Sequence, residues 1–311
     1  MAAKAWGAQQ KAVDEIFFQN DAVSLCLLVN RRARTMRVID FRAGPTMSKR
    51  QFVLSLAKRE GVEKAYTLVE RDEVSTWVKL GFAKEGNIPG FYKRSDAFLL
   101  GSLVPPRPDQ PQPIESETRI AIAKGPEEAP PGNPAVDLAE RTLVHAKKVA
   151  KEMGDKPLPA AKVTVIREPD VRKPLAVALK AGRALTAFEP FGRDVERRYF
   201  SLTARGGFEL IASTESQACF GNAFLELLQA PKNEAEKLCT ISALRALCEK
   251  FLAEGVVSTF SLSPSDDLLM ATAFVANGFR RTGLLQSHLV VGAERKDAII
   301  WSRKLANPAD E

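Results

Sequence analysis

Residues 59–86 read REGVEKAYTLVERDEVSTWVKLGFAKEG, and residues 253–283 read AEGVVSTFSLSPSDDLLMATAFVANGFRRTG. Each stretch runs from a Glu-Gly-Val triplet through an apolar run, a polar turn and a short helical pattern to a Gly-Phe pair and a further glycine. A second apolar run follows each copy and opens with the dipeptide Asp-Ala, at Asp96 and at Asp297. Such self-similarity indicates two copies of one supersecondary unit, and therefore two related domains.

Glycines and apolar runs give the repeat a physical interpretation. Gly61 and Gly255 follow amphipathic segments, at the place where a left-handed residue without a Cβ atom ends a helix. The β-branched and aromatic run that comes next is typical of a buried strand. A second helix ends in the same way at Gly81 or Gly278, and the phenylalanine after it begins an antiparallel hairpin. Each unit is therefore predicted to be helix–strand–helix–strand–strand, an α/β fold with helices on a mixed sheet.

The composition is that of a globular protein with two cores. The chain has 311 residues, of which 45% are hydrophobic and 27% charged. No apolar stretch approaches the roughly 18–20 residues of a membrane span, and the first residues lack the apolar core of a signal peptide. We therefore expect no membrane association and a cytoplasmic location.

Cysteine, histidine and charge restrict the chemistry. The four cysteines lie in apolar surroundings without C-x-x-C spacing, which indicates buried free thiols, and with two distant histidines no metal site is expected. A formal charge of +7 favours anionic partners such as nucleotides or coenzyme phosphates. Nucleic acid is not expected as a partner, because the basic residues are dispersed and no recognition-helix signature appears. The cysteines are Cys26, Cys219, Cys239 and Cys248.

The first domain is assigned to residues 1–104. Its expected elements are a short helix within residues 1–20, strands over 22–29 and 36–40, and a helix over 48–59 with Ser48 as its N-cap. The first copy of the repeat completes this domain.

Proline marks a connection between the domains. Nine of the nineteen prolines fall between Pro105 and Pro134, which is typical of an extended, semi-rigid linker. Residues 105–160 are assigned to this linker, and they include an amphipathic helix over 137–153. The sequence leaves open whether that helix docks on one domain or bridges both.

The second domain is assigned to residues 161–311. Its expected elements are a strand over 163–166, a helix over 171–180, a hairpin of strands 199–202 and 208–213, a long apolar strand over 218–228 and a helix over 233–254. The second copy of the repeat then ends the chain.

This order of elements resembles the GNAT superfamily of N-acetyltransferases. Members of that family run from a strand and helices through an antiparallel meander to strand–helix–strand–helix and a final hairpin. The second domain resembles that order throughout, and the first resembles only its later part. The hairpin over residues 81–97 is similar to that of β-lysine N-acetyltransferases. The resemblance therefore implies two GNAT-like acyl-CoA N-acyltransferase folds, the first truncated.

The resemblance also implies a coenzyme site and an amine acceptor, either a small molecule or a protein. Acetyl-CoA would lie between the strands over 218–228 and 257–262, with its pyrophosphate on a glycine-rich loop at a helix N-terminus. Aligning the repeats places the two glycine positions on Cys239 and Ile241 in the second domain, and on Gly44 and Thr46 in the first. Neither domain keeps both glycines. The implied coenzyme-binding residues are Leu227, Leu228, Lys237, Cys239, Thr240, Ile241, Gly44 and Thr46.

The same resemblance suggests a general base and indicates that the family's frequent general acid is absent. Glu226 lies in the strand where the family often carries its general base, although an outward-facing glutamate is an alternative interpretation. The family's frequent acid, a tyrosine before the Gly-Phe pair, is replaced by Phe274 in one copy and Trp77 in the other. His288 is either a substrate contact or a partly exposed strand residue.

Two hypotheses follow from these residues. One is an acetyl-CoA-dependent N-acetyltransferase with Glu226 as base. The other is a catalytically degenerate tandem protein that acts as a binding or regulatory module. The complete order of elements in the second domain favours the enzyme, whereas the missing glycines and the missing tyrosine favour the degenerate protein.

Overall fold

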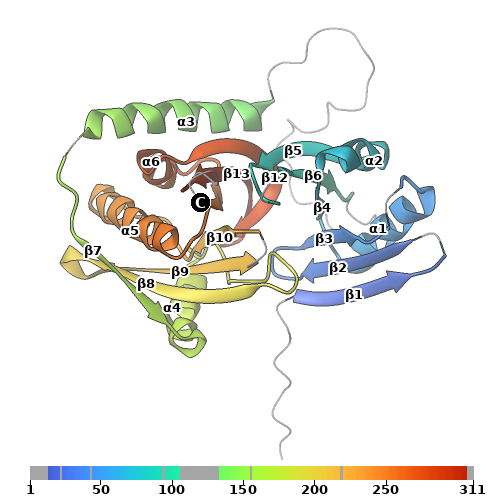
Figure 1. The fold of residues 1–311 in the computed structure, drawn as a ribbon, viewed down its shortest axis with the longest axis horizontal. Coiled ribbons are helices and arrows are strands. Elements are labelled where there is room, and N and C mark those ends of the chain that lie inside the picture. The colour runs from blue at the N-terminus through green and yellow to red at the C-terminus, as the bar shows by residue number, and fades with distance from the viewer. Residues whose placement is uncertain are drawn as a thin grey trace, which may run out of the picture.

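One continuous sheet of thirteen strands organises the molecule (Figure 1). The computed structural model describes residues 13–21, 23–42, 44–92, 95–105, 133–154, 156–217 and 220–306. Along the sheet the strands follow the order β1-β2-β3-β4-β6-β5-β12-β13-β11-β10-β9-β8-β7. We call residues 13–105 the N-terminal half and residues 133–306 the C-terminal half.

The N-terminal half contributes six strands and packs two helices against them. Apolar side chains of α1, α2 and the strands form its core. Its elements are β1 (Val13–Gln19), β2 (Ser24–Asn30), β3 (Thr35–Asp40), α1 (Met47–Arg59), β4 (Lys64–Val69), η1 (Arg71–Glu73), α2 (Val74–Lys79), β5 (Ala83–Ile88) and β6 (Ala97–Leu103).

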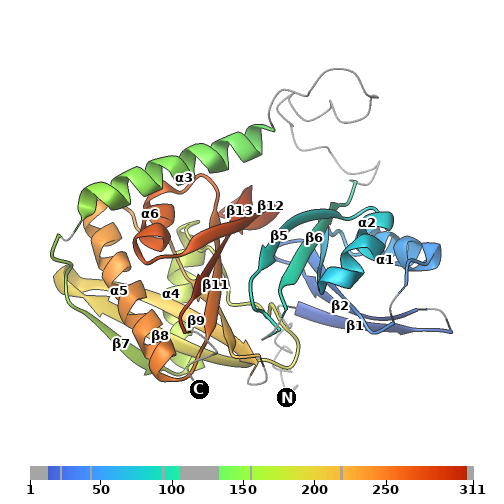
Figure 2. The same ribbon diagram turned by 45° about the horizontal axis from the view of Figure 1, so that its top comes forward.

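The C-terminal half contributes seven strands and has helices on both faces of its sheet. Helices α5 and α6 cover one face with α3 beside them, and α4 packs on the other (Figures 1 and 2). Its elements are α3 (Pro134–Met153), β7 (Ala161–Ile166), α4 (Glu168–Lys180), β8 (Glu196–Ala204), η3 (Arg205–Gly207), β9 (Phe208–Gln217), β10 (Asn222–Leu227), α5 (Glu234–Ala253), β11 (Ser258–Pro264), α6 (Leu268–Ala276), β12 (Arg280–Val291) and β13 (Glu294–Lys304).

The repeat folds as its glycines predict. Gly61, Gly81, Gly255 and Gly278 all have positive φ and follow α1, α2, α5 and α6. The repeated aspartates bridge their hairpins. Asp96 accepts the backbone N–H of Gly90 at 2.9 Å, and Asp297 accepts that of Ser287 at 2.6 Å. Helix stops and hairpins are therefore the features that the two copies share.

Two local predictions in the first domain are wrong. The described part of residues 1–20 is the strand β1, in which Ile16 and Phe18 pack on the core while Phe17 faces outward. That two-residue period is typical of a strand at the edge of a sheet. Helix α1 begins at Met47 with Thr46 as its N-cap residue, ahead of the expected Ser48.

Helix α3 docks on the C-terminal half, which answers the question that the sequence left open. Its buried residues Ala139, Leu143 and Ala146 belong to the same core as α5 and α6. Glu140 on this helix accepts from Arg281 of β12 at 2.9 Å. The proline-rich residues 106–132 lie outside the described residues, and the predicted domain boundaries stay a prediction.

The two halves join where their repeats meet. β5 pairs antiparallel with β12 through Gly86 opposite Gly283, which are the same glycine of the two copies. A Cβ atom on either residue would lie 2.6 Å from the Cα of the other. The junction therefore has the form of an isologous interface, with equivalent patches face to face.

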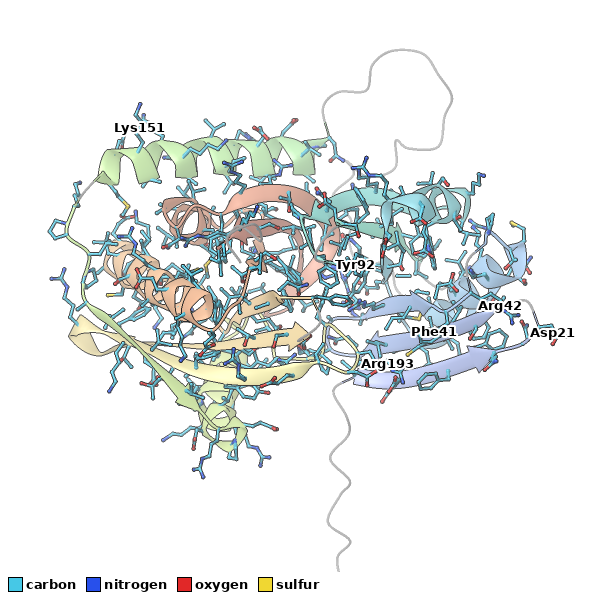
Figure 3. All side chains as sticks on the ribbon, viewed as in Figure 1. Asp21, Phe41, Arg42, Tyr92, Lys151 and Arg193 are labelled. Atoms are coloured by element: carbon cyan, nitrogen blue, oxygen red, sulfur yellow. The ribbon has the colours of Figure 1, made fainter. Side chains whose placement is uncertain are left out.

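Aromatic contacts across the junction follow the same pseudo-symmetry. His288 of the C-terminal half meets the ring of Tyr66 edge-on with ring centroids 4.9 Å apart. Its repeat counterpart in the N-terminal half, Phe91, meets Phe260, the counterpart of Tyr66, at 5.8 Å. Tyr92 and Arg193 lie along this boundary in Figure 3.

We predict that Gly86→Ala lowers the free energy of unfolding by about 2 kcal/mol, because the added methyl group overpacks the strand junction. Gly283→Ala should do the same. Thr282→Ala is the control, since it removes a hydroxyl contact to Ser302 and a methyl group beside the junction without adding an atom, and it should cost about 1 kcal/mol. Urea titration measures all three, and equal losses for the glycine and threonine variants would contradict the prediction.

Candidate functional site

The central parallel strands of the C-terminal half separate before they end. Pairing between β10 and β11 stops at Leu225 opposite Ser261, although both strands continue. Leu228 donates its backbone N–H to the carbonyl of Ile211 in β9 at 2.9 Å. Because backbone groups of successive strand residues point to opposite sides, the N–H and C=O of Leu227 face the gap between β10 and β11.

A small cavity lies beside this gap. Its volume is about 80 Å³. β10 contributes Glu226 to its wall, β12 contributes His288, and Glu189 comes from the loop between α4 and β8 (residues 181–195). Tyr66 of β4 completes the wall from the N-terminal half. Both halves therefore build this site.

The carboxylate of Glu226 is held inward by three donors. Thr186 Oγ1 donates to Oε1 at 2.6 Å, and Arg197 Nη1 and Ser213 Oγ each donate to Oε2 at 3.0 Å. The side chain is 10% exposed, so the alternative of an outward-facing glutamate is wrong. Burial raises the pKa of Glu226 to about 7, because desolvation outweighs the attraction of Arg197. A carboxyl with such a pKa can take and return a proton near neutral pH.

The loop over residues 181–195 is fastened from both sides. Arg32 of the N-terminal half binds both oxygens of Glu189, one of them at 3.1 Å, and Arg37 donates to the carbonyl of Phe191. From the C-terminal half, Glu215 accepts the backbone N–H groups of Phe191 and Gly192, the latter at 2.8 Å. Since Thr186 of this loop also binds Glu226, the N-terminal half helps to place the carboxylate.

The structure contradicts the expected phosphate site in the second domain. Helix α5 begins at Glu234, so the four predicted residues lie within its first turns instead of in a loop ahead of it. Ile241 is fully buried. The helix begins within one residue of its predicted start, so the positions obtained by aligning the repeats fall inside it. The four residues are Lys237, Cys239, Thr240 and Ile241.

The true N-terminus of α5 is occupied by side chains of the chain itself. The amide oxygen of Asn233 accepts the N–H of Glu236 at 3.0 Å, and Glu236 accepts the N–H of Lys232 at 2.8 Å. Glu234 adds a second carboxylate to this turn and pairs with Lys237. These groups supply the negative charge that a helix N-terminus attracts, so this end of α5 does not fit a pyrophosphate.

The corresponding place in the N-terminal half is filled by a lysine. Gly44, with φ of 120°, and Thr46 precede α1 as predicted. However, the buried ammonium of Lys49 binds the carbonyl oxygens of Arg42 at 2.8 Å and Gly44 at 2.9 Å, and it pairs with Asp40. The loop therefore turns carbonyl oxygens inward, which is the opposite polarity to a phosphate cradle.

The positions expected to hold an acid are structural. Trp77 and Phe274 are almost fully buried, and Phe274 stacks on Trp301 with ring centroids 5.4 Å apart. Sequence reasoning missed Tyr66 and left His288 as either a substrate contact or a partly exposed residue, whereas both side chains are buried at the cavity. The difference between His288 and Phe91 at equivalent repeat positions is a signal that could have marked this site.

Neither a metal-binding cluster nor a membrane-spanning helix is found among the described residues. Within the described ranges, no group of three or more His, Cys, Asp or Glu residues is arranged to hold a metal ion. No helix in those ranges is long and apolar enough to cross a bilayer. Cys26, Cys239 and Cys248 are free and buried, as predicted, and Cys219 lies outside the described residues.

The element order defines the class of fold. In the C-terminal half, β7 and α4 lead into the β8–β9–β10 meander, then α5, β11, α6 and the β12–β13 hairpin. The N-terminal half repeats this order from its meander onward. The predicted α/β fold, with helices on a mixed sheet and a shorter first unit that repeats the later part of the second, is confirmed.

Comparison with known proteins yields structures but no sequence family. No protein-family model and no curated protein matches the sequence. One similar solved structure is the ribosomal-protein-S18-alanine N-acetyltransferase from Escherichia coli, with 18% identity, a TM-score of 0.36, and coverage of 47% of this chain and 95% of that one. Another is a spermidine N-acetyltransferase from Vibrio cholerae in complex with CoA and spermine, with 9% identity, a TM-score of 0.38 and the same coverages.

We predict that the buried Glu226 makes stability depend on pH. Between its ordinary pKa of 4.5 and about 7 the folded protein keeps a proton that the unfolded chain releases, so stability falls as pH rises through this window. The Glu226→Gln variant lacks this component. Urea unfolding at pH 5 and pH 8 should show a larger loss in the wild type, by on the order of 3 kcal/mol. Equal losses in both proteins would contradict a raised pKa.

Proposed function

We propose that the C-terminal half transfers an acyl group from a coenzyme A thioester to an amine. The observation that carries this proposal is Glu226, a buried carboxyl with a pKa near 7 at the point where β10 and β11 separate. A base in that place can deprotonate an amine beside a donor held in the gap. The GNAT-like element order supports the same reaction class.

The donor would bind through the gap between the strands. The outward N–H and C=O of Leu227 can hydrogen-bond the amide groups of a pantetheine arm, as a neighbouring strand would. Leu228 does not share this role, because its N–H already donates to Ile211. The gap thus fits the pantetheine arm of acetyl-CoA, whereas the N-terminus of α5 does not fit its pyrophosphate.

The chemistry needs one proton relay. The amine nitrogen attacks the thioester carbonyl carbon, Glu226 takes one amine proton, and the C–S bond breaks with its electron pair moving to sulfur. The protonated carboxyl then returns the proton to the thiolate, which leaves an amide and a thiol. A single group with a pKa near 7 serves as base and then as acid, so a tyrosine at the position of Phe274 is not required.

A second candidate function is a binding module without catalysis. The observation that favours it is the self-capped N-terminus of α5, where Glu234 and Glu236 stand in place of a phosphate site. Titration calorimetry with acetyl-CoA separates the candidates. The acyltransferase requires heat of binding at or below millimolar ligand, and a silent titration confirmed by an unchanged melting temperature would leave the binding module.

We predict that Glu226→Gln slows acetyl transfer at least tenfold, because the amide cannot accept the amine proton. The wild-type rate should rise with pH up to about 7, where Glu226 becomes ionised, and the variant should lose this limb of the profile. Release of coenzyme A thiol from acetyl-CoA measures both. An unchanged rate would remove Glu226 from the mechanism.

We also predict that Glu234→Gln strengthens acetyl-CoA binding several-fold. The exposed carboxylate of Glu234 repels coenzyme phosphates at the start of α5. Glu249→Gln is the matched control, because it removes the same charge from an exposed position in the last turn of the same helix. Calorimetric dissociation constants for the two variants should differ, and equal constants would mean that the phosphates lie elsewhere.

A further inference from the structure

One polar side chain at the cavity has no use in the chemistry described so far. His288 is 7% exposed, and within the described residues its Nδ1 has no hydrogen-bond partner. Burial, together with nearby Lys64 and Arg295, lowers the pKa of His288 well below its usual value, so the ring is neutral. A neutral imidazole offers one donor and one acceptor nitrogen. A buried group of this kind is completed by a partner from outside the chain, either a water molecule or a ligand.

The ring of His288 is fixed by the other half of the molecule. Tyr66 of β4 packs against it edge-on with ring centroids 4.9 Å apart. Arg32 and Arg37, also from the N-terminal half, hold Glu189 and the carbonyl of Phe191 in the loop that forms the adjacent wall. The N-terminal half therefore shapes this side of the cavity without supplying a base.

Size restricts what the cavity can take. Its volume of about 80 Å³ is roughly half that of the engineered cavity of about 150 Å³ that holds a benzene ring. The part of an acceptor that enters is consequently smaller than an aromatic ring. A short aliphatic chain is compatible with this space.

Charge restricts the acceptor as well. Arg32 pairs with Glu189, and Arg197 pairs with Glu215 and Glu226, so each carboxylate around the site already has an arginine partner. His288 adds no charge. A polycation gains nothing from such a wall, because it would have to displace arginines that are already hydrogen-bonded. A molecule with one amine and an uncharged remainder fits better.

We propose that the cavity is a composite acceptor site for a short aliphatic amine that carries one neutral hydrogen-bonding group, with Glu226 facing the amine and His288 binding the neutral group. This inference rests on the proposed acyl transfer. It assigns the N-terminal half the role of a specificity wall, through Tyr66 and the two arginines that hold the loop.

Two substrates of equal size test the proposal. With acetyl-CoA as donor, 3-aminopropanol and n-butylamine differ only in a terminal hydroxyl against a methyl group. The wild-type protein should favour 3-aminopropanol about tenfold in kcat/KM, because a site with a buried imidazole loses its hydrogen bond to the alkyl amine. Spermidine should be a poorer substrate than 3-aminopropanol.

Variants connect that preference to the imidazole. His288→Phe installs the residue that the first repeat carries at Phe91, so it keeps an aromatic contact with Tyr66, and it should lower the preference to about one while n-butylamine still reacts. His288→Gln restores a hydrogen-bonding group and should regain part of the preference, which guards against a merely misfolded phenylalanine variant. His145→Phe, on the exposed side of α3, is the control.

The outcomes distinguish a failure of the acceptor-site proposal from a failure of the proposed acyl transfer. A preference that survives in His288→Phe, or spermidine as the best substrate, would overturn the composite site and leave acyl transfer intact. If no amine reacts in the wild type and acetyl-CoA does not bind, the proposed function itself fails. Loss of all activity in both His288 variants, with folding preserved by circular dichroism, would show a catalytic instead of a selective role and would also overturn the inference.

Discussion

The close approach of Gly86 and Gly283 is the constraint on which the rest of the molecule depends. Two sheets can share one ladder here because neither strand carries a side chain at the contact. His288 and Phe91 each follow their glycine along the chain and reach the opposite half. A side chain at either glycine would force the two strands apart next to His288, which lines the cavity together with Tyr66.

The two copies share this scaffold but use it differently. In the first copy, buried Lys64 pairs with Glu85 at 2.7 Å, and Glu85 also accepts the N–H of Gln286 from the other half at 3.2 Å. The Glu85 carboxylate lies over Gly101, where a Cβ atom would be 2.5 Å away. Lys64 donates to the carbonyl of Gln286 as well, so this ion pair binds the backbone of β12 on both sides. The first copy thus contacts the second across the junction, and Lys49 occupies the loop that the sequence predicts to bind phosphate.

The features that could be predicted from the sequence are those that depend on neighbouring residues in the chain. Helix stops at glycine, strand starts and hairpins depend on neighbours in the chain, so the repeat and the fold class could be predicted from residues 59–86 and 253–283. β1 is harder to predict, because its period of two, seen at Ile16 and Phe18, extends over only a few residues. The start of α5 could be predicted to within one residue, but the coenzyme positions could not, because aligning the repeats places Cys239 and Ile241 inside the helix.

The geometry of the site depends on contacts between residues that are far apart in the chain. Its two ends are Glu226 and the N-terminus of α5. The residue type of Glu226 suggested a base, but its inward orientation comes from Arg197, Ser213 and Thr186, which are distant in sequence. At the start of α5, carboxylates of the chain lie beside the N–H groups that a pyrophosphate would need. Because these carboxylates are attached to the same helix, they compete with an incoming phosphate at high effective concentration. A donor would therefore draw its binding energy from the arm in the β10–β11 gap. The carboxylate of Glu226 and the carboxylates at the start of α5 stand on different elements, β10 and α5.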